Sequence, residues 1–449
     1  MNYEIITAEE ILALLELRQY KELKDVLEEM HPVDLAEMME DFEDKQIILV
    51  FRLLQKEEAA ETFTYMNSDT REVLLNALTD SEIKEVMEEM YLDDTVDVLE
   101  ELPANVVDRL LLATDEETRA QINELLKYPE DSAGSIMNVE YIAFQKDMTV
   151  EEAILKIRQV GINRETIYTC YVTEKRRLIG VVTVKDLLTS GDNRLIEEIM
   201  ETNIQYVNTH DDQEMVAGMI SKYDLIALPV VDNENCMVGI VTVDDAMEVM
   251  EEETTEDISM MAGIVAPSEE SYFETSVWQH AKSRFPWLLF LMLSATLSGL
   301  VLGHFEAAII SMPILNTFIT MLTGTGGNCG SQSSTLIIRG LAVDEIEFKD
   351  IFRVIFKEIR VALLVGSMLA VANGIRIVIM YHAPILALSL GITMICTVIL
   401  AKVIGCILPL VAKKVGLDPA LMAAPLITTL VDAGTILIYF MIVTRIYGI

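Results

Sequence analysis

The chain has 449 residues, 51% of them hydrophobic, and a formal net charge of −39. This length allows two or three domains with packed cores, and the acidity argues against nucleic acid, whose phosphates it would repel, and favours cationic partners. The charge is unevenly distributed, because residues 1–275 carry a net charge of −43 and residues 276–449 a net charge of +4. The sequence therefore predicts an acidic soluble part followed by an apolar, slightly basic part.

Several common classes of protein are not indicated by the sequence motifs. The five cysteines show no CxxC spacing and three of them lie in apolar segments, so we expect neither disulfide bonds nor a zinc site. The first ten residues, MNYEIITAEE, lack the basic and apolar regions of a secretory signal. We recognise no nucleophile with a base, no HExxH motif and no phosphate-binding loop, and we therefore expect a protein that is not an enzyme.

Residues 1–130 are predicted to form an all-α superhelical domain. Between residues 7 and 127 apolar residues recur at spacings of three and four and glycine is absent, a pattern typical of short amphipathic helices. A weak echo between residues 36–42 and 96–102 indicates stacked helical hairpins. Asp93 and Asp97 fall one turn apart on one helix face, where a divalent cation would relieve their repulsion. For either residue alone, a solvated acidic face is the simpler interpretation.

Residues 131–250 contain an internal repeat, with residues 136–188 matching residues 199–250. Each copy ends in an apolar strand that contains a glycine and leads into a helix. One copy alone leaves a sheet face uncovered, so we expect the two to pack as one α/β module.

These repeats resemble a tandem pair of CBS domains. The strand-Thr-x-x-Asp-helix ending of that family occurs twice here, at Thr183 with Asp186 and at Thr242 with Asp245. In the family these residues often hold the ribose of an adenine nucleotide, and the resemblance therefore allows ATP as a ligand. A Thr followed three residues later by an acid is also a helix-capping pattern, and both interpretations stay open.

An acidic connecting segment follows at residues 251–275, with its start near residue 244. Residues 244–268 contain acids at eight positions and no lysine or arginine. A helix with this pattern is destabilised by like charges and would be stabilised by cations, and a disordered acidic linker is the alternative. We favour a helix because the segment leads directly to Trp278, Arg284 and Trp287, the aromatic and basic marks of a membrane interface.

Residues 276–449 are predicted to form a membrane domain of five helices. The segments that reach spanning length, for which about 20 apolar residues suffice, are residues 287–309, 313–338, 359–381, 384–410 and 420–446. Lysine and arginine cluster before the first segment, between the second and third, and between the fourth and fifth. The positive-inside rule then puts the N-terminal domains in the cytoplasm and the C-terminus outside.

The second and fifth segments carry polar groups that are costly in a membrane. The second contains a glycine-rich polar run in which Asn328 and Gln332 lie one turn apart and offer amide oxygens. The fifth carries Thr428 and Asp432 on one face, with Pro425 expected to kink the helix. A carboxylate at mid-membrane usually faces a bundle interior or a watery path, so Asp432 is a candidate for lining a cation pathway. A structural acid hydrogen-bonded between helices is the alternative.

The order of these parts resembles the MgtE family of magnesium channels over essentially the whole chain. The specific marks are residues 128–134 (YPEDSAG), 326–332 (GGNCGSQ) with 339–342 (RGLA), and 418–420 (DPA) followed by Pro425, Thr428, Thr429 and Asp432. The resemblance implies a homodimer in the inner cell membrane with one pore on its two-fold axis, lined by the second and fifth helices. Asp432 of both subunits would hold a Mg²⁺ that keeps its waters, as suits an ion that dehydrates reluctantly.

The same resemblance implies that the cytoplasmic domains bind Mg²⁺, which bridges the helical domain, the CBS pair and the connecting helix, called the plug, and closes the pore. The corresponding acids are Asp93, Asp97, Glu214, Asp224, Asp245, Glu248, Glu253, Glu256 and Asp257, with Asp418 at the membrane end. The function expected is a Mg²⁺-gated, Mg²⁺-selective channel. The alternatives are a broader transporter of divalent cations such as Co²⁺ and Mn²⁺, and a membrane-anchored CBS nucleotide sensor.

Overall fold

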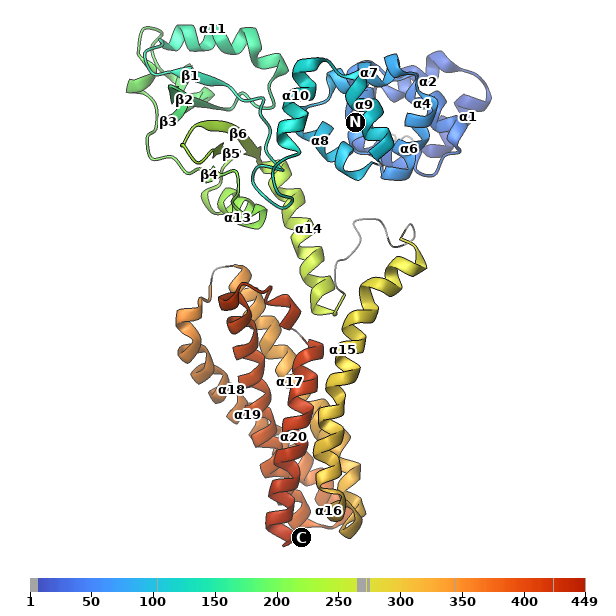
Figure 1. The fold of residues 1–449 in the computed structure, drawn as a ribbon, viewed down its shortest axis with the longest axis vertical. Coiled ribbons are helices and arrows are strands. Elements are labelled where there is room, and N and C mark those ends of the chain that lie inside the picture. Colours follow the sequence, from blue (N-terminus) through green and yellow to red (C-terminus); the bar gives the residue numbers. More distant parts are fainter. Residues whose placement is uncertain are drawn as a thin grey trace, which may run out of the picture. The chain divides into compact units, whose positions relative to one another are not determined.

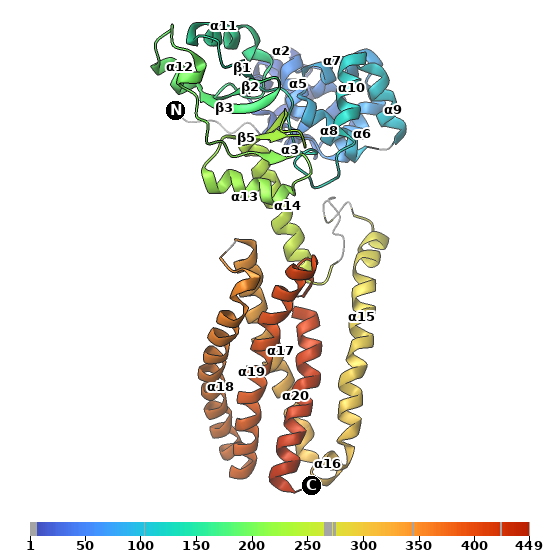
Figure 2. The same ribbon diagram turned by 60° about the vertical axis from the view of Figure 1, so that its left-hand side comes forward.

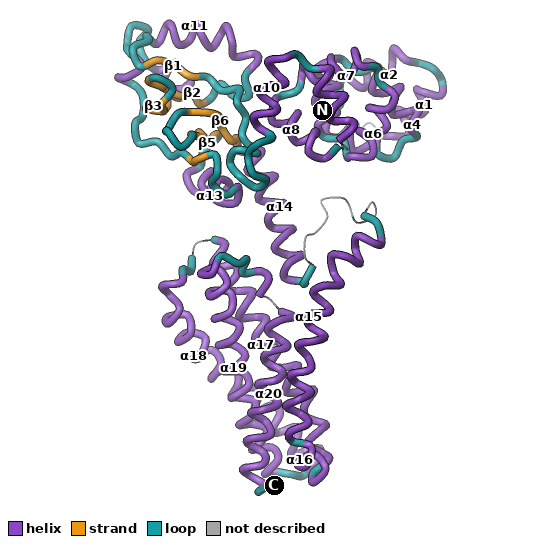
Figure 3. The backbone as a smooth tube through the Cα atoms, in the orientation of Figure 1, coloured by secondary structure: helices purple, strands orange, loops and turns teal. Residues whose placement is uncertain are grey.

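The protein is described by a computed structural model that covers residues 7–102, 104–264, 272, 275–343, 345–422 and 424–448. The chain divides into two compact units, Met1–Glu251 and Glu252–Ile449. Among the described residues, strands occur only in the first unit, and the second consists of helices and their connections (Figure 3).

The first part of the first unit is a stack of short helices, as the sequence predicts (Figure 1). Their bounds are α1 Ala8–Glu16, α2 Tyr20–Leu27, α3 Pro32–Met39, α4 Asp44–Phe51, α5 Lys56–Thr64, α6 Ser68–Ala77, α7 Asp80–Glu89, α8 Leu92–Glu101, α9 Ala104–Ala113 and α10 Glu116–Leu125. Helices two apart in the chain pack on each other, for example α3 on α5, α5 on α7 and α7 on α9. This regular packing produces the superhelical domain, and it buries apolar residues of every helix in one continuous core.

The second part of the first unit consists of two small sheets of identical topology. The elements are β1 Ala143–Gln145, α11 Val150–Val160, β2 Thr169–Glu174, β3 Arg177–Thr183 and α12 Val184–Thr189, and then β4 Val207–Asn208, α13 Gln213–Tyr223, β5 Ala227–Val231 and β6 Met237–Thr242. In each sheet the first strand pairs parallel with the second, and the second pairs antiparallel with the third. The internal repeat is therefore a structural repeat.

The two repeats interlock. Asn138, which precedes the first repeat's strands, forms a bridge with Ile240 of β6, and Glu201 forms the equivalent bridge with Val181 of β3. A glycine at each crossing makes room for a methionine of the other copy, since a Cβ on Gly180 would lie 2.5 Å from Met200 Sδ. A Cβ on Gly239 would meet Met137 Sδ at 2.8 Å in the same way. This exchange explains why the two copies form one module.

Helix α14, Val243–Met261, follows directly from β6, so the acidic segment is helical from residue 243 to residue 261. Residues 265–271, 273 and 274 of the predicted connecting segment lie outside the described residues.

The second unit contains the long apolar helices (Figure 2). Their bounds are α15 Val277–His304, α16 Glu306–Ser311, α17 Asn316–Ala342, α18 Ile351–Tyr381, α19 Pro384–Val415 and α20 Ala424–Tyr447. Four stretches of the described chain are long and apolar enough to cross a membrane, and they correspond to α15, α18, α19 and α20. Helix α17 has 27 residues but contains the polar run, which keeps it out of that group.

Helix boundaries differ from the predicted segments, and the differences in α15 and α20 have clear local causes. Helix α15 begins at residue 277 because the Ser276 hydroxyl caps it by accepting the Gln279 N–H, and it ends at residue 304 because Phe305 leaves the helical conformation. Helix α20 begins at Ala424, after a short 3₁₀ turn at Ala420–Met422 that Asp418 caps. Pro425 therefore lies in the first turn of α20, where proline costs no helical hydrogen bond, and the predicted interior kink is wrong.

Helices α17, α18, α19 and α20 form the packed part of the second unit. The most extensive contacts join α18 to α19, α17 to α19 and α17 to α20. Helix α15 contacts α20 but has no buried residue among those described. The core of this unit therefore lies around α17, α19 and α20, and two of these helices, α17 and α20, carry the predicted pore residues.

Candidate functional site

Thr428, one of the four predicted pore residues, lies where α17 meets α20. A Cβ on Gly327 of α17 would lie 3.0 Å from Thr428 Cγ2, and one on Gly330 would lie 2.6 Å from Ile427 Cγ2. The two backbones approach this closely because the residues of α17 at the contact have no side chain. Thr428 thus lies against α17, and Asp432 follows one turn further along α20.

Asp432 is half-buried, and its Oδ1 atom is buried without a hydrogen-bond partner among the described residues. The alternative of a structural acid held by neighbouring helices requires such a partner, and the described residues supply none for this oxygen. A buried carboxylate oxygen needs a donor or a cation, so this atom is suited to a hydrated ion.

Asn328 and Gln332 lie on a different face of α17 from the glycines. Both are exposed in the single chain, whereas Gly326, Gly327 and Gly330 are buried. At about 100° per residue, the two amides fall roughly opposite the packed face. The structure thus brings α17 and α20 together, but it leaves these two amides on the open side of the chain.

A second polar site lies in the first unit, where α8 meets the CBS module. Asp93 of α8 is buried, with 8% of its surface exposed. Its Oδ1 accepts a hydrogen bond from the side-chain amide of Asn138 at 3.0 Å, and the same amide donates to Glu165 Oε2 at 3.1 Å. One buried asparagine therefore joins a carboxylate of the helical domain to a carboxylate of the CBS module.

The acids around this contact raise each other's pKa. Burial, followed by the charges of Asp94, Asp245 and Glu165, raises the pKa of Asp93 well above its usual value. Burial and then Asp245 raise the pKa of Asp94 to about 6, and burial and then Asp245 and Asp244 raise that of Glu165 to about 7. This cluster, Asp93, Asp94, Asp97, Glu140, Glu165, Asp244, Asp245 and Glu248, is called the acidic cluster below.

Three further members of the acidic cluster also have a raised pKa. Asp97 lies at its exposed rim, yet loss of hydration and then the charge of Asp94 raise its pKa to about 7. Burial raises the pKa of Glu140, whose Oε2 is buried without a hydrogen-bond partner among the described residues. Burial also raises the pKa of Asp245, although hydrogen bonds from Thr242 oppose the shift.

The other predicted regulatory acids fall into two places. Glu214 lies in the first turn of α13 and Asp224 caps its other end, so the helix keeps them roughly 15 Å apart. In the second unit, Glu253, Glu256 and Asp257 lie on α14. Burial, then the charge of Asp418 and then that of Glu253, raises the pKa of Asp257 to about 6.

No three His, Cys, Asp or Glu side chains in the described part of the chain approach closely enough to hold a metal ion together.

The candidate nucleotide residues form helix caps. The Thr183 N–H donates to the Asp186 carboxylate at 3.0 Å, and the Asp186 N–H donates to the Thr183 hydroxyl at 3.2 Å. At the second position the Thr242 N–H donates to the Asp245 carboxylate at 3.2 Å. The capping interpretation is confirmed, and nucleotide binding stays a prediction. Asp245 serves both this cap and the acidic cluster.

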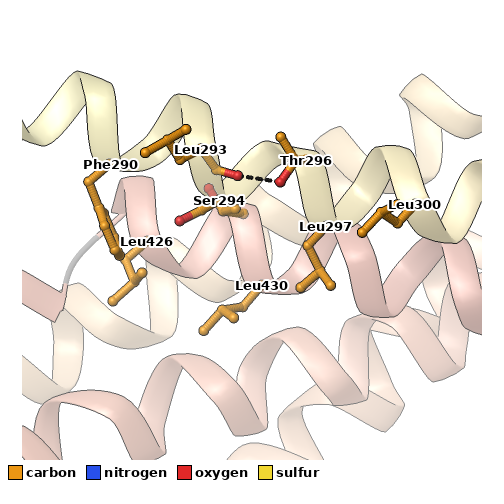
Figure 4. A pocket seen from close by; sticks show the side chains of 9 residues that line it. Phe290, Leu293, Ser294, Thr296, Leu297, Leu300, Leu426 and Leu430 are labelled. Carbon is orange, nitrogen blue, oxygen red and sulfur yellow. Dashed lines mark hydrogen bonds between the residues drawn. The ribbon is translucent and has the colours of Figure 1, made fainter.

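An apolar groove of about 280 Å³ lies between α15 and α20 (Figure 4). Leucines and Phe290 line it, and the one hydrogen bond drawn there is internal to α15, from the Thr296 hydroxyl to the Leu293 carbonyl. None of the described residues that line the groove is charged.

These observations define a class: a membrane cation transporter with a carboxylate between packed spanning helices and an acidic soluble part that contains a CBS pair. A family model described as "Divalent cation transporter", MgtE, matches residues 319–442, the MgtE intracellular N domain matches residues 30–131, and CBS domains match residues 133–192 and 196–252. The chain belongs to the MgtE family.

Individual relatives agree over nearly the full length. The chain is 37% identical to "Magnesium transporter MgtE" of Thermus thermophilus over 93% of both chains, and 31% identical to that of Bacillus subtilis over 97% of this chain and 96% of the other. It is also similar to a solved structure of the cytosolic domain of the Mg²⁺ channel MgtE in complex with ATP. That match has 38% identity and a TM-score of 0.52, and it covers 54% of this chain and 99% of the other.

Sequence reasoning missed several groups at these sites. Asp94 is adjacent to Asp93, and the repulsion between neighbouring acids that selected Asp93 and Asp97 could have selected it as well. Asn138, Glu140 and Glu165 lie in connecting segments with no periodicity, and only the tertiary fold brings them to α8. Lys402, a basic residue inside the apolar segment 384–410, was a visible signal for a buried charge in the membrane unit.

Proposed function

We propose that this protein is a Mg²⁺-selective channel that imports Mg²⁺ down its electrochemical gradient. The observation that carries the proposal is Asp432, a half-buried carboxylate of α20 whose buried Oδ1 has no hydrogen-bond partner among the described residues. It follows Thr428, which contacts α17 at Gly327. The names of the two full-length relatives, both magnesium transporters, support the choice of ion.

The pathway is formed by a homodimer in a cell membrane, with α17 and α20 of both copies around the two-fold axis. The exposed amides of Asn328 and Gln332 support this arrangement, because polar groups on the open face of a membrane helix need a partner or a water-filled path. In this arrangement α17 also spans the membrane, which makes five spanning helices. The soluble domains lie in the cytoplasm and the C-terminus lies outside.

Four functional parts are proposed along the chain: residues 1–130 as the helical domain, 131–250 as the CBS pair, 251–275 as the plug and 276–449 as the pore domain. Cytoplasmic Mg²⁺ bound among the first three parts closes the pore. The acidic cluster supports this role, because its carboxyls are pushed toward their neutral forms by mutual repulsion and burial. A divalent cation would remove that repulsion and hold α8 against the CBS module.

Flux into liposomes tests the proposed function. Purified protein should carry Mg²⁺ in preference to Ca²⁺, Mn²⁺ and Co²⁺, and Asp432→Ala and Asp432→Asn should abolish Mg²⁺ flux. Glu306→Gln, which removes an exposed carboxylate of α16, is the matched control and should retain flux. Unchanged flux in both Asp432 variants would refute the pathway, and equal flux of all four ions would establish the broader divalent transporter instead.

A nucleotide role of the CBS pair is a second candidate, supported by the solved ATP complex of a similar cytosolic domain. ATP at Thr183 and Asp186, or at Thr242 and Asp245, would have to share oxygens that now cap α12 and α14. Titration of the full chain with ATP, with and without Mg²⁺, tests this role. Nucleotide binding by a protein that carries no ion would favour the anchored sensor.

A further inference from the structure

Three polar side chains from three different helices meet in the interior of the second unit. Lys402 of α19 donates to the hydroxyl of Ser333 on α17 at 3.0 Å and to the carboxylate of Glu358 on α18 at 3.3 Å. The Ser333 hydroxyl in turn donates to the same Glu358 oxygen at 2.6 Å. The exposed fractions of Lys402, Glu358 and Ser333 are 5%, 9% and 0%. These three residues are called the buried triad below.

A buried ion pair inside a membrane unit is costly. Removing an ammonium and a carboxylate from water costs more than their attraction returns unless the geometry satisfies both groups, and such residues in membrane segments usually serve function. Here the hydrogen bonds form a closed triangle in which the two charges and the hydroxyl satisfy one another. The triad therefore joins α17 to the α18–α19 pair by directional bonds.

Ser333 lies on the buried face of α17, on the opposite side of the helix from the two amides of the candidate pathway. At about 100° per residue, Gly326, Gly330 and Ser333 fall within one narrow sector of the helix, which is buried. The exposed Asn328 and Gln332 fall on the far side. Gln332 is the residue directly before Ser333, so any rotation of α17 that breaks the triad also turns the amides away from their present direction.

The glycine contacts of α17 do not fix its rotation by themselves. A Cβ on Gly330 would lie 3.2 Å from the Ala401 carbonyl oxygen, and a Cβ on Gly405 of α19 would collide with the Gly330 carbonyl. Such contacts set how closely two backbones approach, and the bulky buried side chains nearest to Gly330, Leu322 and Ile337, lie about two turns away on α17. The triad, one turn further along α17, supplies a directional restraint close to the glycine contacts.

We propose that Lys402, Glu358 and Ser333 are positioning residues for ion permeation: they fix the rotation of α17 so that Asn328 and Gln332 face the cation pathway. This inference rests on the proposed function, because it assumes that α17 lines the pathway. The triad itself does not touch the ion. Its effect is transmitted through the orientation of α17.

The test compares variants that separate packing from orientation. Lys402→Met leaves the buried Glu358 carboxylate without its opposite charge, and Glu358→Gln does the same to the Lys402 ammonium. Each single variant should therefore lower the yield of folded protein. The double variant Lys402→Met/Glu358→Gln removes both charges and should recover folding, because replacing a buried pair by neutral groups of similar size is often tolerated. Its Mg²⁺ flux per folded protein should nevertheless fall by about threefold to tenfold, with a changed Mg²⁺:Ca²⁺ ratio. Lys414→Met removes an exposed lysine of the same helix and is the control.

A second readout does not depend on flux. With Asn328→Cys as a reporter, the labelling rate with a water-soluble maleimide should differ between the parent and the double variant, with unsubstituted Asn328 protein as the blank. A double variant that folds with unchanged selectivity and unchanged labelling overturns the inference. If it does not fold, Ser333→Ala, which keeps the ion pair, decides by the same two measurements. If the labelling rate differs between the parent and the double variant but the parent carries no Mg²⁺, the proposed function is contradicted and the positioning role is not.

Discussion

Asn138 donates its side-chain amide to the carboxylate of Asp93 at 3.0 Å, and this bond joins the start of the CBS module to helix α8 of the helical domain. Asn138 is fully buried, and its own side-chain oxygen accepts the Glu140 N–H at 2.6 Å. A neutral donor between two carboxylates lowers the cost of bringing them together. Asn138 therefore holds part of the acidic cluster in place without adding charge to it.

Replacing Asn138 should weaken the first unit and its response to Mg²⁺. Asn138→Ala removes the donor to Asp93 and Glu165 and should lower the free energy of unfolding by roughly 2–3 kcal/mol. Asn138→Asp should be worse without Mg²⁺, because it adds a third carboxylate, and saturating Mg²⁺ should restore part of the loss. Thermal unfolding of the full protein at several Mg²⁺ concentrations measures both. Asn123→Ala, an exposed asparagine of α10, should change neither.

Millimolar Mg²⁺ should protect the soluble part from protease. Residues 1–275 carry a net charge of −43, so the compact arrangement repels itself until cations enter. Asp245→Asn with Glu248→Gln should slow cleavage in chelator, because the repulsion falls, and should weaken the Mg²⁺ effect. Asp34→Asn with Glu37→Gln, exposed acids of α3 outside the acidic cluster, is the matched control. Equal cleavage rates with Mg²⁺ and with chelator would contradict Mg²⁺ binding here.

Without Mg²⁺, the first unit should become more stable as the pH falls from about 8 to about 6. Burial and the neighbouring acids raise the pKa of Glu165 to about 7 and that of Asp94 to about 6, from usual values of 4.5 and 3.8. Between the usual and raised values the folded state binds more protons than the unfolded chain, so stability decreases as pH rises through this window and the full penalty applies above about pH 7. Thermal midpoints in chelator at graded pH measure the slope.

Mg²⁺ should change this pH dependence, because the ion needs the carboxylates that the protons occupy. The Mg²⁺ concentration that gives half-maximal protection should be higher at about pH 6 than at about pH 8. Glu165→Gln should flatten the midpoint curve in chelator by removing one titrating group. Midpoints independent of pH in the parent protein would show that the carboxyls of the acidic cluster titrate normally, and an unchanged slope in Glu165→Gln would show the same for Glu165 alone.

The parts of the fold that follow from local periodicity were predictable. The apolar spacing in residues 7–127 gave the short helices, and the match of residues 177–186 to 236–245 gave two sheets of one topology. The sequence did not predict the interlocking of the repeats, because the bridge between Asn138 and Ile240 joins residues about a hundred positions apart. Pairing between residues so far apart in the chain produces no periodic pattern in the sequence.

The candidate sites divide in the same way. Asp432 was predictable because a carboxylate in an apolar segment is costly wherever the helix goes. Glu165 was not, since its pKa is raised by acids of α14 that only the folded module places nearby. Lys402 could have been found by the rule that selected Asp432, but its partner Glu358 lies 44 residues earlier and only the packing of α18 on α19 identifies it.

The close approach of α17 to α19 and α20 should make Gly330 intolerant of any side chain. A Cβ there would lie 2.6 Å from Ile427 Cγ2 and 3.2 Å from the Ala401 carbonyl oxygen. Gly330→Ala should push α17 away from both helices, cost about 1–3 kcal/mol of stability and lower Mg²⁺ flux, as measured by thermal unfolding in detergent and by liposome uptake.

Gly299→Ala of α15 is the matched control, because a Cβ there meets no atom of the described residues within 4 Å and alanine favours a helix over glycine. It should be as stable as the parent or slightly more so, with unchanged flux. Equal tolerance of both substitutions would mean that α17 lies farther from α20 than this packing requires. In that case Thr428 and Asp432 would not lie beside the polar run of α17, and the pathway proposed between these helices would have to be abandoned.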